Sequence, residues 1–223
     1  ILELSGIGDP EVLLKAGIDV QLSLPGVGTN VQEHLYTGVT YRKYSRLSPS
    51  ILDPTKRHMS LVLALNNPFS RGSIHIRSND FRMQPVIDPR IFEQPYDLIT
   101  MVELVKFARR IAHTEPLAGL LSGTEVYPGP QVETDEQIAE WLKDTISTTY
   151  HTVGSCSMLP LEDDGVVDAK LKVYGTTNIR VVDIGIIPLH VGGHTQGTLG
   201  ALRSILRSRM SCIPCWMQLW HIV

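Results

Sequence analysis

The sequence predicts an α+β fold, in which an antiparallel sheet is covered by helices, and two observations lead to this prediction. Three short apolar or alternating runs, at residues 36–41, 61–65 and 73–77, have the length of strands and are bounded by turn-forming residues. Two longer segments with the apolar spacing of helices begin near Asp97 and Thr134. Strands that precede helices, without regular alternation, are typical of an α+β domain.

The composition is that of a folded globular protein. Of the 223 residues, 43% are hydrophobic and 19% are charged, and the formal net charge is −3. Since the chain has no basic block, it is not expected to bind nucleic acid. No apolar run approaches the ~18 residues of a membrane-spanning helix, so a membrane association is not expected either. The sequence starts at Ile1 rather than Met, which leads us to expect a fragment of a longer protein.

A short helix and a turn are predicted near the N-terminus. Asp9 can cap free N–H groups, Pro10 suits the first helical position, and Gly17 is a favourable stop. Pro25 and Gly28 then mark a turn-rich connection.

The third strand-like run alternates, so Ile74 and Ile76 should face one side of a strand while His75 faces the other. His75 is therefore expected to be an exposed strand residue. His34 and His58 are likewise not expected to be catalytic groups.

Both predicted helices should cover one face of the sheet. Asp97 is predicted to be the N-cap of the first helix, and Arg109 and Arg110 near its end suit the helix dipole. Thr134 and Gln137 have the spacing of a capping box at the start of the second helix. The inward positions are Leu98, Met101, Val102, Val105, Ala108 and Ala112 in the first helix, and Ile138, Trp141, Leu142 and Thr145 in the second.

Two histidines, His151 and His194, lie in the stretch of residues 149–198, and a strand-like run at 179–184 separates them. A chain that leaves His151, runs through a buried strand and returns can bring both imidazoles to one site. A further helix is predicted after His194 from the spacing of Leu199, Leu202, Ile205 and Leu206.

Several segments carry a resemblance to a known family. Residues 4–8 read LSGIG, and residues 24–35 read LPGVGTNVQEHL. Residues 150–158, 165–188 and 192–198 read YHTVGSCSM, GVVDAKLKVYGTTNIRVVDIGIIP and GGHTQGT. In this order, from Ile1 to about Leu202, the segments resemble the C-terminal part of the glucose–methanol–choline (GMC) flavoprotein oxidoreductases.

The resemblance implies a domain organisation in which the α+β substrate domain is joined to the C-terminal part of a GMC FAD-binding domain. Residues 1–30 would be a segment of the FAD-binding domain, 31–148 the substrate-binding domain, and 149–206 a return into the FAD-binding domain with the active site. Residues 207–223 depart from the family pattern, because they are apolar at their end and contain Pro214, which would break a helix. We expect an aberrant tail here, from a frameshift or an unspliced intron, or else an apolar anchor to another protein or a membrane surface.

The resemblance also implies an FAD-dependent oxidoreductase that acts on CH–OH groups, with hydride transfer from a small aryl or secondary-metabolite alcohol to flavin. A neutral imidazole is a suitable base near neutral pH, and the hydride acceptor must be a cofactor. His151 matches the catalytic histidine of the family, and His194 the second active-site position, for which His190 is the competing candidate. The residues implied in cofactor binding are Tyr150, Asp183, Ile184, Thr195 and Gln196.

One departure from the family limits these expectations. The chain contains no G-x-G-x-x-G, and Gly6-Ile7-Gly8 lacks the third glycine and the preceding strand of that motif. We therefore expect that a missing N-terminal FAD-binding part is required for activity and that this chain alone is inactive. Two other interpretations stay open, a non-redox lyase or cyclase on the same scaffold and a truncated, non-catalytic remnant. Cys212 and Cys215 have no second pair of ligands, so no metal site is expected.

Overall fold

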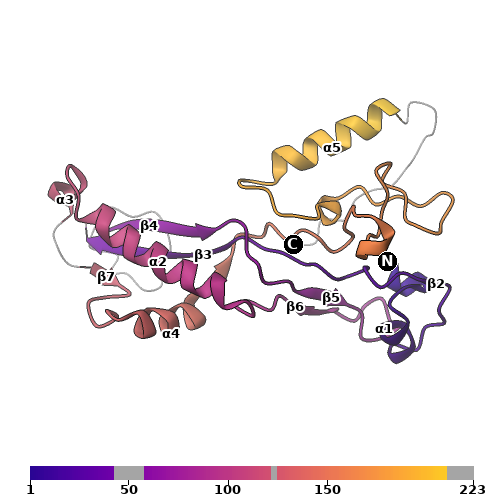
Figure 1. The fold of residues 1–223 in the computed structure, drawn as a ribbon, viewed down its shortest axis with the longest axis horizontal. Helices are drawn as coiled ribbons and strands as arrows, with labels where there is room; N and C mark the ends of the chain where they lie inside the picture. The colour runs from indigo at the N-terminus through magenta and orange to yellow at the C-terminus, as the bar shows by residue number, and fades with distance from the viewer. Residues whose placement is uncertain (43–57, 122–124, 210–223) are drawn as a thin grey trace.

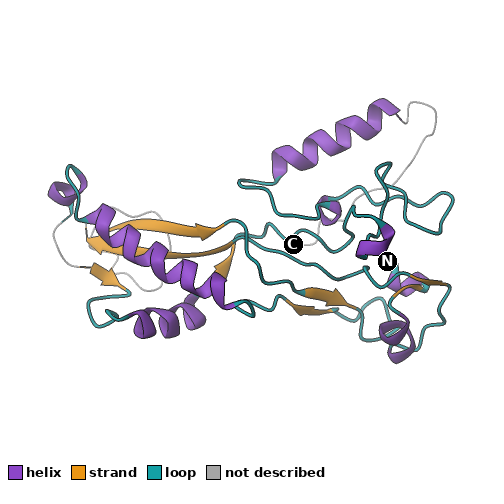
Figure 2. Cartoon of the chain, viewed as in Figure 1, coloured by secondary structure: helices purple, strands orange, loops and turns teal. Residues whose placement is uncertain are grey.

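The computed structural model describes residues 1–42, 58–121 and 125–209, and the chain forms an elongated molecule (Figure 1). A sheet covered by helices occupies one end, and a region dominated by loops occupies the other (Figure 2).

The sheet is built around β3 (Leu35–Arg42), which pairs antiparallel with β4 (His58–Leu65) along its whole length. Two short strands, β7 (Glu125–Tyr127) and β8 (Ser147–Thr148), also pair antiparallel with β3. The first two strand predictions are therefore confirmed, although β4 is longer than the predicted run.

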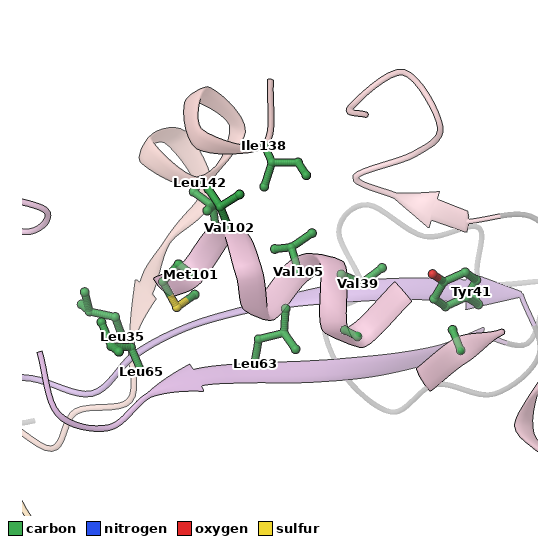
Figure 3. Packing of buried hydrophobic residues seen from close by; sticks show 12 residues of the cluster. Leu35, Val39, Tyr41, Leu63, Leu65, Met101, Val102, Val105, Ile138 and Leu142 are labelled. Atoms are coloured by element: carbon green, nitrogen blue, oxygen red, sulfur yellow. The ribbon is translucent and has the colours of Figure 1, made fainter. Parts of the chain in front are cut away.

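The helices α2 (Pro95–Ala112) and α4 (Asp135–Thr145) pack on this sheet, and the one-turn helix α3 (Leu117–Leu120) follows α2. Their apolar sides meet the inner face of β3 and β4 in one core (Figure 3). The arrangement confirms the predicted α+β fold with covering helices. The buried core residues are Leu35, Val39, Tyr41, Leu63, Leu65, Met101, Val102, Val105, Ala108, Ala112, Ile138 and Leu142.

The prediction that Asp97 is the N-cap of the first helix is wrong. Gln94 occupies that position, and Pro95 is the first helical residue. The Asp97 side chain is fully buried and accepts hydrogen bonds from the backbone N–H groups of Phe69 and Ser70, both at 2.8 Å. Its carboxylate therefore caps the loop after β4 rather than its own helix.

The capping box at the start of α4 is confirmed. The Thr134 hydroxyl accepts from Gln137 N at 3.2 Å, and the Gln137 side chain accepts from Thr134 N at 3.0 Å. Ile138 and Leu142 face inward as predicted.

A buried ion pair links α2 to the sheet. Arg109 donates to Glu125 through Nε and Nη2, at 2.9 and 2.8 Å, and the Tyr41 hydroxyl donates to the same carboxylate at 3.1 Å. Burial, together with the Glu125 charge, raises the pKa of Tyr41. Arg109 thus has a structural partner beyond the helix dipole with which it was predicted to interact.

The N-terminal region contains η1 (Glu3–Ser5), a parallel pair of β1 (Ile7–Gly8) and β2 (Leu22–Ser23), and α1 (Pro10–Lys15). The cap of α1 is confirmed, because the Asp9 side chain accepts from Glu11 N at 2.8 Å. A second core joins this region to residues 166–186 and is formed by Ile7, Leu24, Val27, Val166, Val167, Leu171, Val173 and Ile186.

The third predicted strand is shorter than expected. It forms β5 (Ser73–His75), which pairs antiparallel with β6 (Val86–Asp88). His75 is not a free surface residue, since its side chain is 22% exposed and its Nδ1 lies 2.6 Å from Oε1 of the buried Glu3. The pair connects β5 to the N-terminal segment.

The predicted strand at residues 179–184 is absent. This part of the chain forms one isolated bridge, between Lys172 and Arg180, and then η3 (Ile184–Ile186). Ile179 is 37% exposed, so the apolar run lacks both the burial and the pairing that a core strand needs. The loop-rich region also contains η2 (Leu161–Asp163).

The last described element is α5 (Gln196–Arg209), which confirms the predicted helix after His194. It extends into the segment that was predicted to be an aberrant tail. Pro214, Cys212 and Cys215 lie outside the described residues, as does the rest of that tail. Among the helices that the structure describes, none has the length and apolarity required to span a membrane.

Candidate active site

The segment 31–34, just before β3, contacts both later stretches of the chain that carry the histidines of the candidate site. It lies between two later parts of the chain, because Gln32 forms a backbone bridge with Val153 and its side chain binds the 188–190 turn. The side-chain amide of Gln32 donates to Pro188 O at 2.9 Å, and its oxygen accepts from His190 N at 3.1 Å. Gln32 thus connects both histidine-bearing stretches, one through its backbone and the other through its side chain.

Close packing around Gly154 is what allows this arrangement. Gly154 has a φ of +95°, and a Cβ placed there would lie 2.0 Å from the Asn30 carbonyl oxygen. Only glycine tolerates both the left-handed backbone and the contact. The chain that follows His151 can therefore lie directly against the 30–32 segment.

Glu33 holds the backbones of two histidines. Its Oε1 accepts from the N–H groups of His34 at 2.9 Å and His151 at 2.8 Å, and its Oε2 accepts from the Thr152 hydroxyl at 2.7 Å. Together with a longer contact from the Thr149 hydroxyl at 3.4 Å, these hydrogen bonds let one half-buried carboxylate fix where each imidazole leaves the backbone.

Three imidazoles form a row. His34 Nδ1 lies 2.9 Å from His151 Nδ1, and His151 Nε2 lies 3.2 Å from His194 Nδ1. The His34 ring is buried, whereas His194 is exposed. His151 therefore has one ring nitrogen turned to the interior and one turned to an accessible partner.

His190 has a different position from His194. It is 5% exposed and stacks on His34, with ring centroids 3.5 Å apart. Its Nε2 donates to the backbone carbonyl of His151 at 2.8 Å. Of the two competing histidines, the structure places His194 at the His151 ring nitrogen and His190 against the His151 backbone.

Burial determines the charge of the two inner histidines. It lowers the pKa of His34 below the ordinary value of 6.5, and the His190 and His151 rings act in the same direction, whereas Val191 O and Glu33 oppose them. Burial also lowers the pKa of His190. Both rings are therefore neutral at pH 7.

The residues expected to bind cofactor lie partly around this row. Tyr150 precedes His151, is 87% exposed and has a φ of +61°, an uncommon value for a tyrosine. Thr195 and Gln196 follow His194 and lead into α5. Asp183 and Ile184 lie at the start of η3, as its N-cap and its first residue.

The Asp183 side chain caps η3 by accepting from Gly185 N at 2.8 Å, and no hydrogen bond within the described part of the chain joins it to a histidine. Cys156 N donates to Gly185 O at 2.8 Å, which connects η3, and with it Ile184, to the chain after His151. Within the described ranges, no cluster of histidine, cysteine and carboxylate side chains has the arrangement of a metal site.

The sequence-based interpretation missed His34 and Glu33 as members of the site. Both lie in the segment 24–35 that carried the family resemblance, but no local pattern connects that segment to His151. The resemblance alone offered a signal, because a segment shared with an enzyme family is a reasonable place to look for site residues.

Comparisons with known proteins give the same family as the resemblance. A family model described as "GMC oxidoreductase" matches residues 68–202. The GMC oxidoreductase family protein Mala s 12 of Malassezia sympodialis is 29% identical over 92% of this chain and 46% of its own length. Choline oxidase of Arthrobacter globiformis is 32% identical over 86% of this chain and 42% of its own length.

The fold is also shared with solved structures. An FAD-dependent oxidoreductase from Chaetomium thermophilum superimposes with a TM-score of 0.80 at 21% identity, over 95% of this chain and 53% of that chain. The chain spans about half the length of the relatives it matches. The predicted fold class, including the C-terminal part of a GMC flavoprotein, is confirmed. Since the family model covers more than half of the sequence, the chain belongs to the GMC oxidoreductase family.

Proposed function

We propose that this chain forms part of an FAD-dependent oxidoreductase that oxidises the CH–OH group of a small alcohol. The contact between His151 Nε2 and His194 Nδ1, at 3.2 Å, is the observation that carries the proposal. Two imidazoles at this spacing can share one substrate oxygen, one removing its proton and the other donating a hydrogen bond to it. Membership of an oxidoreductase family supports the same reaction.

His151 is the base in this proposal. Its Nε2 accepts the hydroxyl proton, and His194 donates a hydrogen bond that stabilises the developing negative charge on the oxygen. The bound FAD supplies the hydride acceptor, which no side chain can provide. Glu33 keeps the His151 backbone in place through the 2.8 Å hydrogen bond, so the imidazole needs little reorganisation.

The surface around His194 suits a flavin. Within the described part of the chain, Gly192, Gly193 and Gly197 have open space where a side chain would stand, so the backbone there is accessible. Gln196 begins a helix of 14 residues, whose first turn presents free N–H groups and positive potential. We propose that Thr195 and Gln196 face the flavin ring at this terminus, with Tyr150 beside it and Asp183 and Ile184 contributing from the η3 side.

The domain boundaries are part of the same proposal. Residues 1–30 and 149–206 would belong to the FAD-binding domain, and 31–148, with the sheet and α2, to the substrate-binding domain. The ADP part of FAD needs a Gly-rich motif that this sequence lacks. We therefore propose that this chain alone binds FAD weakly or not at all and that an N-terminal FAD-binding part completes the enzyme.

The relatives and the site support a proposal for the substrate class. Choline, named as the substrate of one relative, is a small primary alcohol. We propose a small alcohol for this protein too, and an aryl or secondary-metabolite alcohol as its more specific form.

The proposal is tested with the full-length holoenzyme under anaerobic conditions. Adding a panel of small aliphatic and aryl alcohols should bleach the flavin absorbance with at least one of them, while the matching ethers, which have no hydroxyl proton, should not. A holoenzyme that eliminates from or cyclises a substrate while its flavin spectrum stays unchanged would be a lyase or cyclase and would contradict the proposal.

A further inference from the structure

The tautomer of His34 is fixed by a backbone carbonyl. His34 Nε2 lies 2.9 Å from Val191 O. A carbonyl oxygen can only accept a hydrogen bond, so the proton must be on Nε2. In neutral His34, Nδ1 then carries a lone pair and can only accept.

This assignment determines the tautomer of His151. His34 Nδ1 lies 2.9 Å from His151 Nδ1, and two lone pairs cannot form a hydrogen bond. His151 must therefore donate through an Nδ1–H group. Its remaining nitrogen, Nε2, is left with the lone pair, and this is the nitrogen that lies 3.2 Å from His194.

A second set of contacts agrees with the same tautomer. The Thr149 hydroxyl oxygen lies 2.9 Å from His151 Nδ1 and 3.4 Å from Glu33 Oε1. A carboxylate accepts, so the Thr149 hydroxyl proton is directed to Glu33 and its oxygen can accept from His151 Nδ1–H.

We propose that His34 is a positioning residue, which holds His151 as its Nδ1–H tautomer so that the Nε2 lone pair faces His194 and the substrate. The inference rests on the proposed function, because it assumes that His151 is the base. Its premise that His34 is neutral agrees with burial, which lowers the His34 pKa, and with the stacked His190, since two cations 3.5 Å apart would repel each other.

Two substitutions of His34 in the full-length holoenzyme separate this role from packing. In His34→Asn the amide oxygen can stand near the former Nδ1 and still accept from His151. In His34→Gln the amide group reaches towards Val191 O, so His151 Nδ1–H loses His34 as an acceptor and keeps only the Thr149 hydroxyl oxygen. Where a histidine binds a metal, loss of the partner that orients its ring typically lowers activity about 10–100-fold, and we expect an effect of the same order here.

We expect His34→Gln to lower the limiting rate of flavin reduction about 10–100-fold with little change in KM. His34→Asn should restore much of that rate. His113→Asn, a substitution of an exposed histidine at the end of α2, is the control and should leave the rate unchanged. Equal losses in His34→Asn and His34→Gln, or no loss in either, would overturn the inference.

A measurement on the unsubstituted holoenzyme determines the tautomer of His151 even if both His34 variants fail to fold. In ¹⁵N-histidine NMR spectra, the His151 signals are identified by their disappearance in His151→Gln. We expect a protonated Nδ1 and an unprotonated Nε2 for His151 at pH 7. The opposite pattern, with the proton on Nε2, would overturn the inference.

The outcomes also distinguish this inference from the proposed function. If His151→Gln oxidises the alcohol at the normal rate, His151 is not the base and the proposed function itself fails. If His151→Gln is inactive while His34→Gln is normal, only the role of His34 is wrong.

Discussion

The carboxylate oxygen Oδ2 of Asp97 accepts hydrogen bonds from both the backbone N–H and the hydroxyl group of Ser70, at 2.8 and 2.6 Å. The contact joins the first turn of α2 to the loop after β4, and Ser70 Oγ in turn accepts from Gln94 N at 3.0 Å. The start of α2 and the loop after β4 are therefore held together by one buried carboxylate.

Replacing Asp97 should destabilise the protein strongly. In Asp97→Ala, each backbone donor that loses its partner in the interior costs about 1–3 kcal/mol. Asp97→Asn should cost less, because its amide oxygen can still accept. Chemical denaturation of both variants gives the free energies of unfolding, with Asp144→Ala, on the exposed side of α4, as the control. If Asp97→Ala unfolds at the same denaturant concentration as the control, these hydrogen bonds contribute nothing.

Gly154 is expected to be irreplaceable. In Gly154→Ala the new Cβ would collide with the Asn30 carbonyl oxygen, and the backbone would have to leave its φ of +95°. We expect loss of stability and of any activity that needs His151 beside His34.

Gly200→Ala is the matched control, because Gly200 lies in α5 and, apart from the neighbouring backbone of the helix, no described atom lies within 4 Å of the added Cβ. Alanine is favoured over glycine in a helix by about 1 kcal/mol, so this variant should be neutral or slightly more stable in thermal unfolding. Equal melting temperatures for both variants would contradict the close packing at Gly154.

Local sequence patterns predicted the elements of this fold but not its long-range contacts. The capping box at Thr134 and the cap at Asp9 were correct because both depend on hydrogen bonds within four residues. Asp97 was misassigned because its partners, Phe69 and Ser70, lie 27 to 28 residues away, and burial beside two unpaired N–H groups outweighed its local preference.

In the candidate site, too, local sequence patterns did not predict the long-range contacts. His151 and His194 could be proposed from the family resemblance. The contact of His151 with His34, however, spans 117 residues, and the spacing of residues in the sequence cannot predict such a contact. The strand predicted at 179–184 failed for a related reason. An apolar run becomes a strand only where a neighbouring strand pairs with it, and the described chain offers Arg180 a single bridge.

Stability should fall on mild acidification because of His34 and His190. Burial lowers the pKa of each below 6.5, so below that pH the unfolded chain binds more protons than the folded chain. The free energy of unfolding then decreases as the pH falls from 6.5 towards the folded-state values, and this contribution is constant above about pH 7.

Thermal unfolding measured between pH 7.5 and 5 tests whether the stability decreases as the pH falls. His34→Asn and His190→Asn remove one titrating group each and should show a weaker dependence on pH than the unsubstituted protein, whereas His113→Asn serves as the exposed control. If the protein instead becomes more stable as the pH falls from 7 to 6, the two buried rings are protonated in the folded state and the account of the inner histidines is wrong.

The central claim is that His151 is the base for alcohol oxidation, and the rate of anaerobic flavin reduction by an alcohol, in the full-length protein, tests it most directly. His151→Ala should retain FAD, as judged by its absorbance, and reduce the flavin about 10²–10⁴-fold more slowly. His194→Asn should lose less, because an amide can still donate one hydrogen bond to the substrate oxygen. If His151→Ala reduces its flavin at the rate of the unsubstituted enzyme, the claim is contradicted.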